Sequence, residues 1–262
     1  QTLNSAMPWL TEHLRSYDQY ARLTVDGLSG PARLANASRA EITTLQSMVF
    51  LRVDAGFEAR PLPHEAQLTA AFSPVVADFD NDGAEDIVLS QNEFSVHGEE
   101  SRQDAGFGLL LSGRGDGSFE DRGIGESGLT VFGEGRGAAA ADFNHDGRTD
   151  LLICQNGSKP KLFLNQAERR GLRVRLQAGE GNRDGVGAIL RLESNEKLGP
   201  ARVVRLGSGF LSQNATTQIL GGAEGATALR VAWPSGGSEW FDLTPGQTAL
   251  TAVEGRGRVV VD

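Results

Sequence analysis

One segment of the chain occurs twice, 64 residues apart, and this repeat constrains the fold more than any other feature. The copies are residues 73–92 (SPVVADFDNDGAEDIVLSQN) and 137–156 (GAAAADFNHDGRTDLLICQN), and eight of their twenty aligned positions are identical. In each copy an acidic, glycine-containing loop joins two mostly apolar runs of strand length. The sequence therefore predicts two equivalent units of short strands.

A weaker echo extends the repeat. VFLRVDAGFE around Phe57 and LLLSGRGDGSFE around Phe119 each contain an apolar run, a Gly/Asp turn, an aromatic residue and an acid. Together the two similarities give units of about sixty residues built from hairpins, which is the pattern of four-stranded propeller blades. Arg114-Gly115-Asp116 falls where this pattern requires a hairpin turn, so we interpret it as a turn.

Composition supports a mostly β fold. Glycine accounts for 34 of 262 residues, about twice the usual share of roughly 7%, as expected for many short strands joined by tight turns. No run approaches the roughly 18 apolar residues that a membrane-spanning helix needs. The formal charge of −9, from 25 basic and 34 acidic residues, argues against nucleic acid as a partner.

The repeated loops have the spacing of a calcium-binding loop. Each places oxygen-bearing side chains at positions 1, 3, 5 and 9 and glycine at position 6, and the position-7 carbonyl can supply a further oxygen. An EF-hand is excluded because position 12, its bidentate glutamate, is Leu89 or Ile153 here, and because an apolar strand follows each loop. We expect two Ca²⁺ ions. Their ligands would be Asp78, Asp80, Asp82, Ala84 and Asp86 in one loop and Asp142, Asn144, Asp146, Arg148 and Asp150 in the other.

The segments flanking the repeat differ from it. Apolar and aromatic residues recur at helical spacing from Ser5 to about Leu23, and Gly27 and Gly30 end the pattern, so residues 1–45 are expected to hold one N-terminal helix. Eight short, glycine-separated runs after Arg169 predict an all-β sandwich or small barrel. The predicted plan is a helical segment (1–45), two calcium-loop blades (46–168) and a β domain (169–262). The sole cysteine, Cys154, lies in the apolar run LLIC and is predicted to be a small buried residue.

These residues carry a resemblance to known families. The two loops resemble the calcium loops of FG-GAP/VCBS repeats, the blades of integrin-α-like propellers. Three C-terminal segments (NRDGVGA at 182–188, GSGFLSQ at 207–213 and WPSG at 233–236) resemble the ASPIC/UnbV domain, which follows such repeats in cartilage acidic protein and in bacterial secreted proteins. One segment departs from that family's pattern, because Gln218–Gly222 stands where it has a His-Phe-Gly-Leu-Gly-like sequence.

The resemblance implies extracytoplasmic binding or scaffolding and no established reaction. The chain begins without a signal-like segment, so we expect that an export signal has already been removed. The four histidines are scattered and no catalytic motif is apparent, so we do not expect an enzyme. A lectin is the alternative, with Trp9, Trp233 and Trp240 as the available stacking platforms.

The number of predicted blades implies a partner. A propeller closes with about four to eight blades, and two cannot close a ring. They would leave apolar faces and strand edges uncovered. We therefore expect a protein partner or a larger complex, with the N-terminal helix and the C-terminal domain covering part of the open surface.

Overall fold

The chain is mostly β and divides into two compact units, residues 1–45 and 46–262. This computed structural model describes residues 8, 14, 16–38, 40–98 and 100–259. The described residues contain four α-helices and several sheets, and none of these sheets closes into a barrel. Mostly β structure was predicted from the repeat and the glycine content, and it is confirmed. Within the described residues no helix is long and apolar enough to cross a membrane.

The described residues of the first unit contain three short helices, α3 (Tyr17–Arg22), α4 (Val25–Ser29) and α5 (Pro31–Leu34). About half of the predicted helix from Ser5 to Leu23 lies outside the described residues, but its last part is helical. The expectation of one helix is wrong beyond that point, because Leu23 adopts an extended conformation and Thr24 caps a new helix that includes Gly27. Tyr17 of the predicted apolar stripe is exposed.

The second unit begins with a hairpin and a four-stranded antiparallel sheet. The hairpin pairs β1 (Met48–Val53) with β2 (Gly56–Pro61), and the 3₁₀-helix η1 (His64–Gln67) follows. The first sheet has the order β3-β4-β5-β6, formed by β3 (Ala71–Ala77), β4 (Asp86–Gln91), β5 (Leu109–Gly113) and β6 (Phe119–Asp121). Arg114–Asp116 lies in the β5–β6 turn, as predicted.

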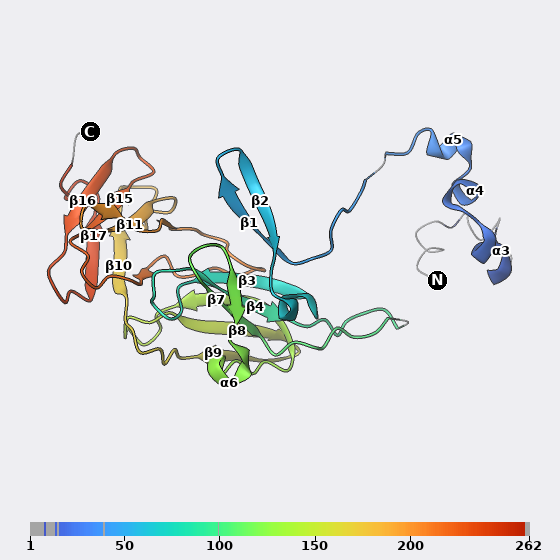
Figure 1. Cartoon of the computed structure of the whole chain (residues 1–262), viewed down its shortest axis with the longest axis horizontal. Coiled ribbons are helices and arrows are strands. Elements are labelled where there is room, and N and C mark those ends of the chain that lie inside the picture. Colours follow the sequence, from blue (N-terminus) through green and yellow to red (C-terminus); the bar gives the residue numbers. More distant parts are fainter. Residues whose placement is uncertain (1–7, 9–13, 15, 39, 99, 260–262) are drawn as a thin grey trace. The chain divides into compact units, whose positions relative to one another are not determined.

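A second antiparallel sheet repeats the first three strands. Helix α6 (Gly123–Ser127) leads into β7 (Glu134–Ala141), β8 (Asp150–Asn156) and β9 (Ser158–Phe163), in the order β7-β8-β9. Ala77 pairs with Asp86 and Ala141 pairs with Asp150, so the 64-residue repeat holds at the level of register. Figure 1 shows the strands of the two sheets beside one another.

The two sheets share a core. Val75 and Val88 of the first sheet pack with Leu151 and Ile153 of the second, together with other buried apolar residues. The opposite face of the first sheet carries Ile87 and Leu111, and it is covered by residues of the β1–η1 region such as Val49, Leu62 and Ala66. The first sheet is therefore covered on both faces.

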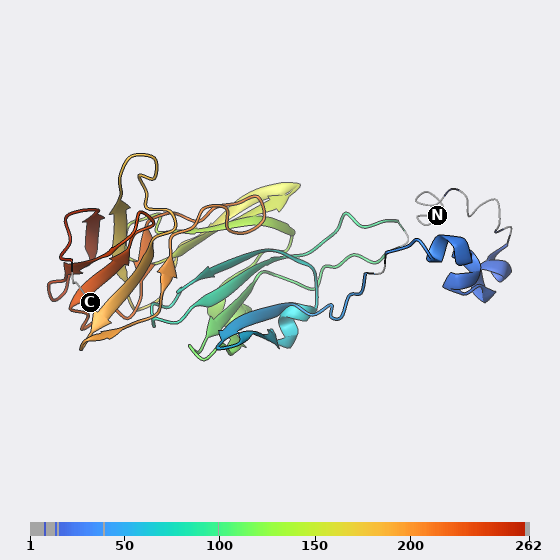
Figure 2. The ribbon, with the colours of Figure 1, turned by 90° about the horizontal axis from the view of Figure 1, so that it is seen from above.

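The C-terminal region contains two further sheets. Strand β10 (Leu172–Gln177) lies between β14 (Gln218–Leu220), which is antiparallel to it, and β17 (Ala249–Val253), which is parallel. The other sheet consists of β11 (Ile189–Ser194), β12 (Lys197–Leu198), β13 (Arg202–Val203), β15 (Ala228–Ala232) and β16 (Ser238–Asp242). Buried residues of both sheets form one cluster that includes Val174, Leu190 and Leu229. In Figure 2 these strands, yellow to red, gather at one end of the 46–262 unit.

The prediction that Cys154 is buried is wrong. Side chains alternate between the two faces of a strand, and Leu151 and Ile153 occupy the core face of β8. Cys154 therefore points to the opposite face, where it is exposed. An apolar run identifies a strand, but it does not show which of the two faces is covered.

Candidate metal centre

The first acidic loop, residues 78–86, joins β3 to β4 and is organised by its own carboxylates. The Asp78 carboxylate accepts hydrogen bonds from the backbone N–H groups of Asp82 (3.1 Å) and Gly83 (2.9 Å). Asp86 accepts N–H groups from Phe79 (2.8 Å) and Gly113 (2.9 Å). Gly83 has a φ of 98°, which side-chain-bearing residues rarely adopt, so the glycine at position 6 is required by the turn.

Both ends of this loop are buried carboxylates. Asp78 and Asp86 are each 2% exposed. Burial raises the pKa of Asp78 to about 6, and the negative charges of Asp86 and Asp82 contribute to this increase. Arg202 and the Gly83 N–H act in the opposite direction and lower the pKa. Burial also raises the pKa of Asp86, against the effect of its two N–H donors. Without a cation, keeping these two carboxylates ionised therefore lowers the free energy of unfolding.

The donor set of the first loop fits one hard cation. Ligand oxygens of Asp78, Asp80 and Asp86 lie within 4.8 Å of one another. Ca²⁺ takes carboxylate and carbonyl oxygens at 2.3–2.6 Å, so a single ion placed among them would neutralise charges that otherwise repel. The side chain of Asp82 instead accepts the N–H of Ala84 at 2.7 Å. The roles of Asp82 and of the Ala84 carbonyl stay predictions.

The second acidic loop, residues 142–150, has the same backbone pattern. Asp142 accepts the N–H groups of Asp146 (3.0 Å) and Gly147 (3.3 Å), and Asp150 accepts those of Phe143 and Asn165 (2.8 Å each). Gly147 has a φ of 81°. The spacing therefore predicted two loops of the same form, and the sequence already showed that Asn144 replaces the carboxylate of Asp80.

The second loop differs in its charges. Asn144 replaces one carboxylate, and the Asp146 carboxylate accepts a hydrogen bond from Arg148 Nη1 at 2.8 Å. Among the described residues, only the first loop gathers three acidic side chains at ligand distance. The structure thus brings three of the predicted first-loop ligands together, while the ligand roles of Asp142, Asn144, Asp146, Arg148 and Asp150 stay predictions.

Residues far from both loops in the sequence contact them. The connector, residues 164–171, follows β9 and hydrogen-bonds to each loop. Asn165 Nδ2 donates to the Phe79 carbonyl (2.6 Å), Asn81 Nδ2 donates to the Arg169 carbonyl (3.2 Å), and Arg148 Nε donates to the Ala167 carbonyl (2.5 Å). None of these contacts follows from the loop motif, since each depends on the folded path of the connector.

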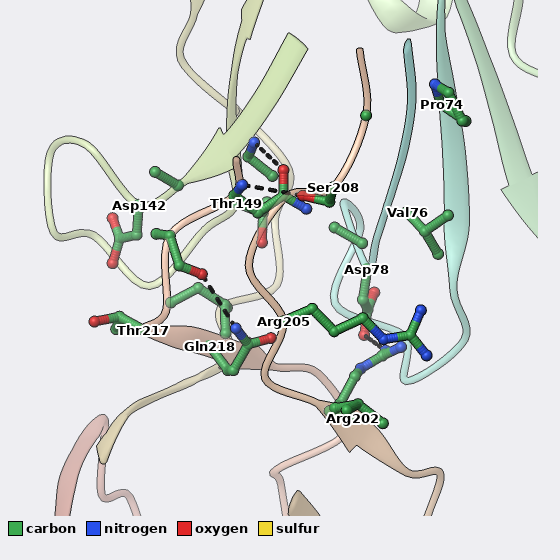
Figure 3. A pocket seen from close by; sticks show the side chains of 18 of the residues that line it. Pro74, Val76, Asp78, Asp142, Thr149, Arg202, Arg205, Ser208, Thr217 and Gln218 are labelled. Carbon is green, nitrogen blue, oxygen red and sulfur yellow. Dashed lines mark hydrogen bonds and ion pairs between the residues drawn. The ribbon is translucent and has the colours of Figure 1, made fainter. Parts of the chain in front are cut away.

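A cavity of about 350 Å³ adjoins both loops. Its walls come from the ends of β3 and β7 and from residues 201–219, and Asp78 and Asp142 both line it. Figure 3 shows Arg202 extending to Asp78, with Arg205 beside it. The C-terminal region is therefore in direct contact with the acidic loops and encloses this polar cavity with the two sheets.

The comparisons with known proteins bear on this C-terminal region. Residues 178–259 match the family model ASPIC and UnbV. The ASPIC and UnbV resemblance predicted from the C-terminal segments is thereby confirmed. The match does not include the acidic loops, whose resemblance to FG-GAP/VCBS repeats stays a prediction. No curated protein matches the chain significantly.

Proposed function

We propose that this chain is a calcium-stabilised, extracytoplasmic interaction module that acts as a non-catalytic subunit of a larger assembly. In this proposal the two sheets are propeller blades, and the C-terminal ASPIC and UnbV region is a β-sandwich packed against their loops. The observation that carries the proposal is a difference in burial between equivalent residues of the two sheets.

One face of the first sheet is covered by the second sheet, while the equivalent face of the second sheet is open. Phe79 is 8% exposed, whereas its repeat equivalent Phe143 is 51% exposed. Leu110 is half-buried, and Leu162, which occupies the same register position beside β8, is 47% exposed. We call the outward side of β7–β9 and the adjoining loop, comprising Ala139, Phe143, Leu152, Cys154 and Leu162, the open face.

The first sheet indicates what fits the open face. There, the equivalent residues contact a β-sheet that presents Leu151, Ile153 and Phe163. A partner sheet with a similar row of apolar side chains would bury the open face in the same way. This supports assembly with a further β-rich subunit.

Calcium would stabilise the loops that support this face. Asp78, Asp80, Asp82, Asp86 and the Ala84 carbonyl would hold one ion, and Asp142, Asn144, Asp146, Asp150 and the Arg148 carbonyl a second. The ions would supply charge neutralisation and loop rigidity. The first loop has one more carboxylate ligand than the second, which favours tighter binding there when other contributions are equal.

The lectin alternative has less support. Trp233 is buried, and the Trp240 ring lies under the Arg230 guanidinium while its Nε1 donates to Glu193 at 2.8 Å. Neither ring is free to stack on a sugar. Trp9 lies outside the described residues.

Two measurements test the proposal. Calorimetry on chelator-stripped protein should show uptake of two Ca²⁺ ions, and absence of uptake would contradict the calcium component.

Gel filtration with light scattering tests the open face, together with binding of an apolar dye. The purified chain should bind the dye, Leu162→Ser should bind less, and Leu211→Ser, at an exposed leucine outside this face, should not change it. A monodisperse monomer that binds no dye would show that no partner is needed.

A further inference from the structure

Each acidic loop is contacted at the same point by an arginine from the C-terminal region. Arg202 of β13 places Nη2 3.5 Å from Asp78 Oδ2 and also forms an ion pair with Glu85. Arg173 of β10 places Nε 3.4 Å from Asp142 Oδ2. Asp78 and Asp142 are equivalent residues, each at position 1 of its loop.

The arginines contact the oxygen that also fixes the loop. Asp78 Oδ2 accepts the N–H of Gly83, and Asp142 Oδ2 accepts the N–H of Gly147. Both carboxylates are almost fully buried, with side-chain exposures of 0% and 2%. Solvent therefore screens the charge of each guanidinium only weakly at these positions.

The backbone of the C-terminal region also lies directly on the loops. The Gly171 N–H donates to the Gly147 carbonyl at 2.8 Å, and the Gly222 N–H donates to the Asn81 carbonyl at 3.3 Å. A Cβ atom on Gly221 would clash with Asp78 Oδ2 and lie 2.7 Å from the Asn81 backbone. The loops are thus part of the docking surface for this region, together with β3 and β7, and one arginine is directed at each loop.

We propose that Arg202 and Arg173 are built-in counter-cations that link docking of the C-terminal region to occupancy of the loops. Each guanidinium neutralises the position-1 carboxylate in the docked, metal-free state. A divalent ion brought to the same carboxylate is repelled by the arginine. Docking and cation binding therefore oppose each other, and by linkage each weakens the other by the same factor.

This inference rests on the proposed calcium binding, and it predicts an order of effects. Arg202 is 9% exposed and has two acidic partners, whereas Arg173 is 29% exposed and has one. The arginine should therefore lower calcium affinity more at the first loop than at the second.

Calorimetric titration with Ca²⁺ tests the inference loop by loop. In an Asp146→Ala background, which leaves the first loop, Arg202→Met should tighten Kd by about tenfold, since removing one nearby charge has an effect of this order. Arg202→Lys, which keeps the charge, should stay closer to the parent. The matched control is Arg205→Met, which removes an exposed arginine three residues away and should change Kd less.

The second loop is tested in an Asp82→Ala background. There, Arg173→Met should tighten calcium binding by a smaller factor, and Arg175→Met, at an exposed arginine, is its control.

A second readout follows docking without relying on calorimetry. Arg169 and Arg170 of the connector are exposed, and trypsin cuts there faster when the connector detaches. In chelator, Arg202→Met should be cut faster than the parent, and by reciprocity Ca²⁺ should accelerate cutting of the parent.

The outcomes separate the inference from the proposed function. No calcium uptake by either the parent or Arg202→Met would overturn both. Normal uptake by the parent with Kd unchanged or weakened in Arg202→Met and in Arg173→Met would overturn the linkage alone. If Arg202→Met does not fold, the Arg173→Met titration decides the inference, because that side chain is the more exposed of the two.

Discussion

At the scale of single residues, the buried carboxyl of Asp78 makes the stability of the metal-free protein depend on pH. Its pKa is raised by burial to about 6, against 3.8 for an ordinary aspartate. Between these values the folded state binds more protons than the unfolded state, so unfolding free energy falls as pH rises through this window. The loss amounts to roughly 3 kcal/mol once pH exceeds 6.

The isosteric variant Asp78→Asn isolates this effect. In chelator, urea unfolding should show the parent losing stability relative to Asp78→Asn between pH 4 and pH 7. Titrations of groups remote from Asp78 are common to both proteins and cancel in the difference. If the difference in unfolding free energy between the two proteins does not change with pH, folding does not raise the pKa of Asp78.

The aspartates at position 5 of the loops give a second residue-scale prediction. Calcium that binds only the folded state adds about 2.7 kcal/mol at a hundredfold excess over Kd. Asp82→Ala and Asp146→Ala should each lower the melting temperature in calcium and reduce its response to chelator. If both variants melt like the parent in both conditions, the loops are acidic turns without a structural ion.

The sequence contained the loops but not their surroundings. The spacing from Asp78 to Asp86 fixes a local turn, so it could be interpreted without the rest of the fold. The Arg202–Asp78 pair joins residues 124 apart, and no local pattern predicts such a contact. The close contact of Gly221 with Asp78 is likewise visible only in the folded chain, because it joins segments far apart in the sequence.

At the scale of elements, the segment after β14 is packed against the first loop too closely for a side chain. Gly221→Ala should cost about 1–3 kcal/mol, because the added methyl group forces Asp78 and the Asn81 backbone to move. Gly98→Ala is the matched control, since a Cβ there meets no atom within 4 Å. Thermal unfolding of both variants measures the difference, and equal melting temperatures would show that this contact is loose.

Strand patterns were predicted better than helices and faces. Seven of the eight C-terminal runs contain a strand, and the described part of the last run forms an isolated bridge between Trp240 and Arg258. The helical pattern was misleading after Leu23, because capping by Thr24 starts a new helix that the apolar spacing does not reveal. Cys154 was assigned to the wrong face because alternation along β8 fixes two faces but not which one is covered.

At the scale of the whole molecule, the 46–262 unit has separate cores held together by its loops. One cluster lies between the two sheets and another within the C-terminal region, and the connector and the arginines join them. The sequence predicted the repeated pair of acidic loops and the β-rich C-terminal region. It could not predict that the acidic loops form the joint between them, since this depends on how the connector folds back.

The place of β10 bears on where the C-terminal domain can be cut from the chain. The matched family segment begins at residue 178, but β10 ends at Gln177 and is the central strand between β14 and β17. A fragment of residues 178–262 would lose Val174 from the core and leave two strand edges unpaired, so it should be insoluble or unfolded by circular dichroism. A fragment of residues 169–262 should fold. The folding unit would then begin before residue 178, where the match to the ASPIC and UnbV family starts. A comparison restricted to residues 178–259 would omit the central strand of this sheet, β10.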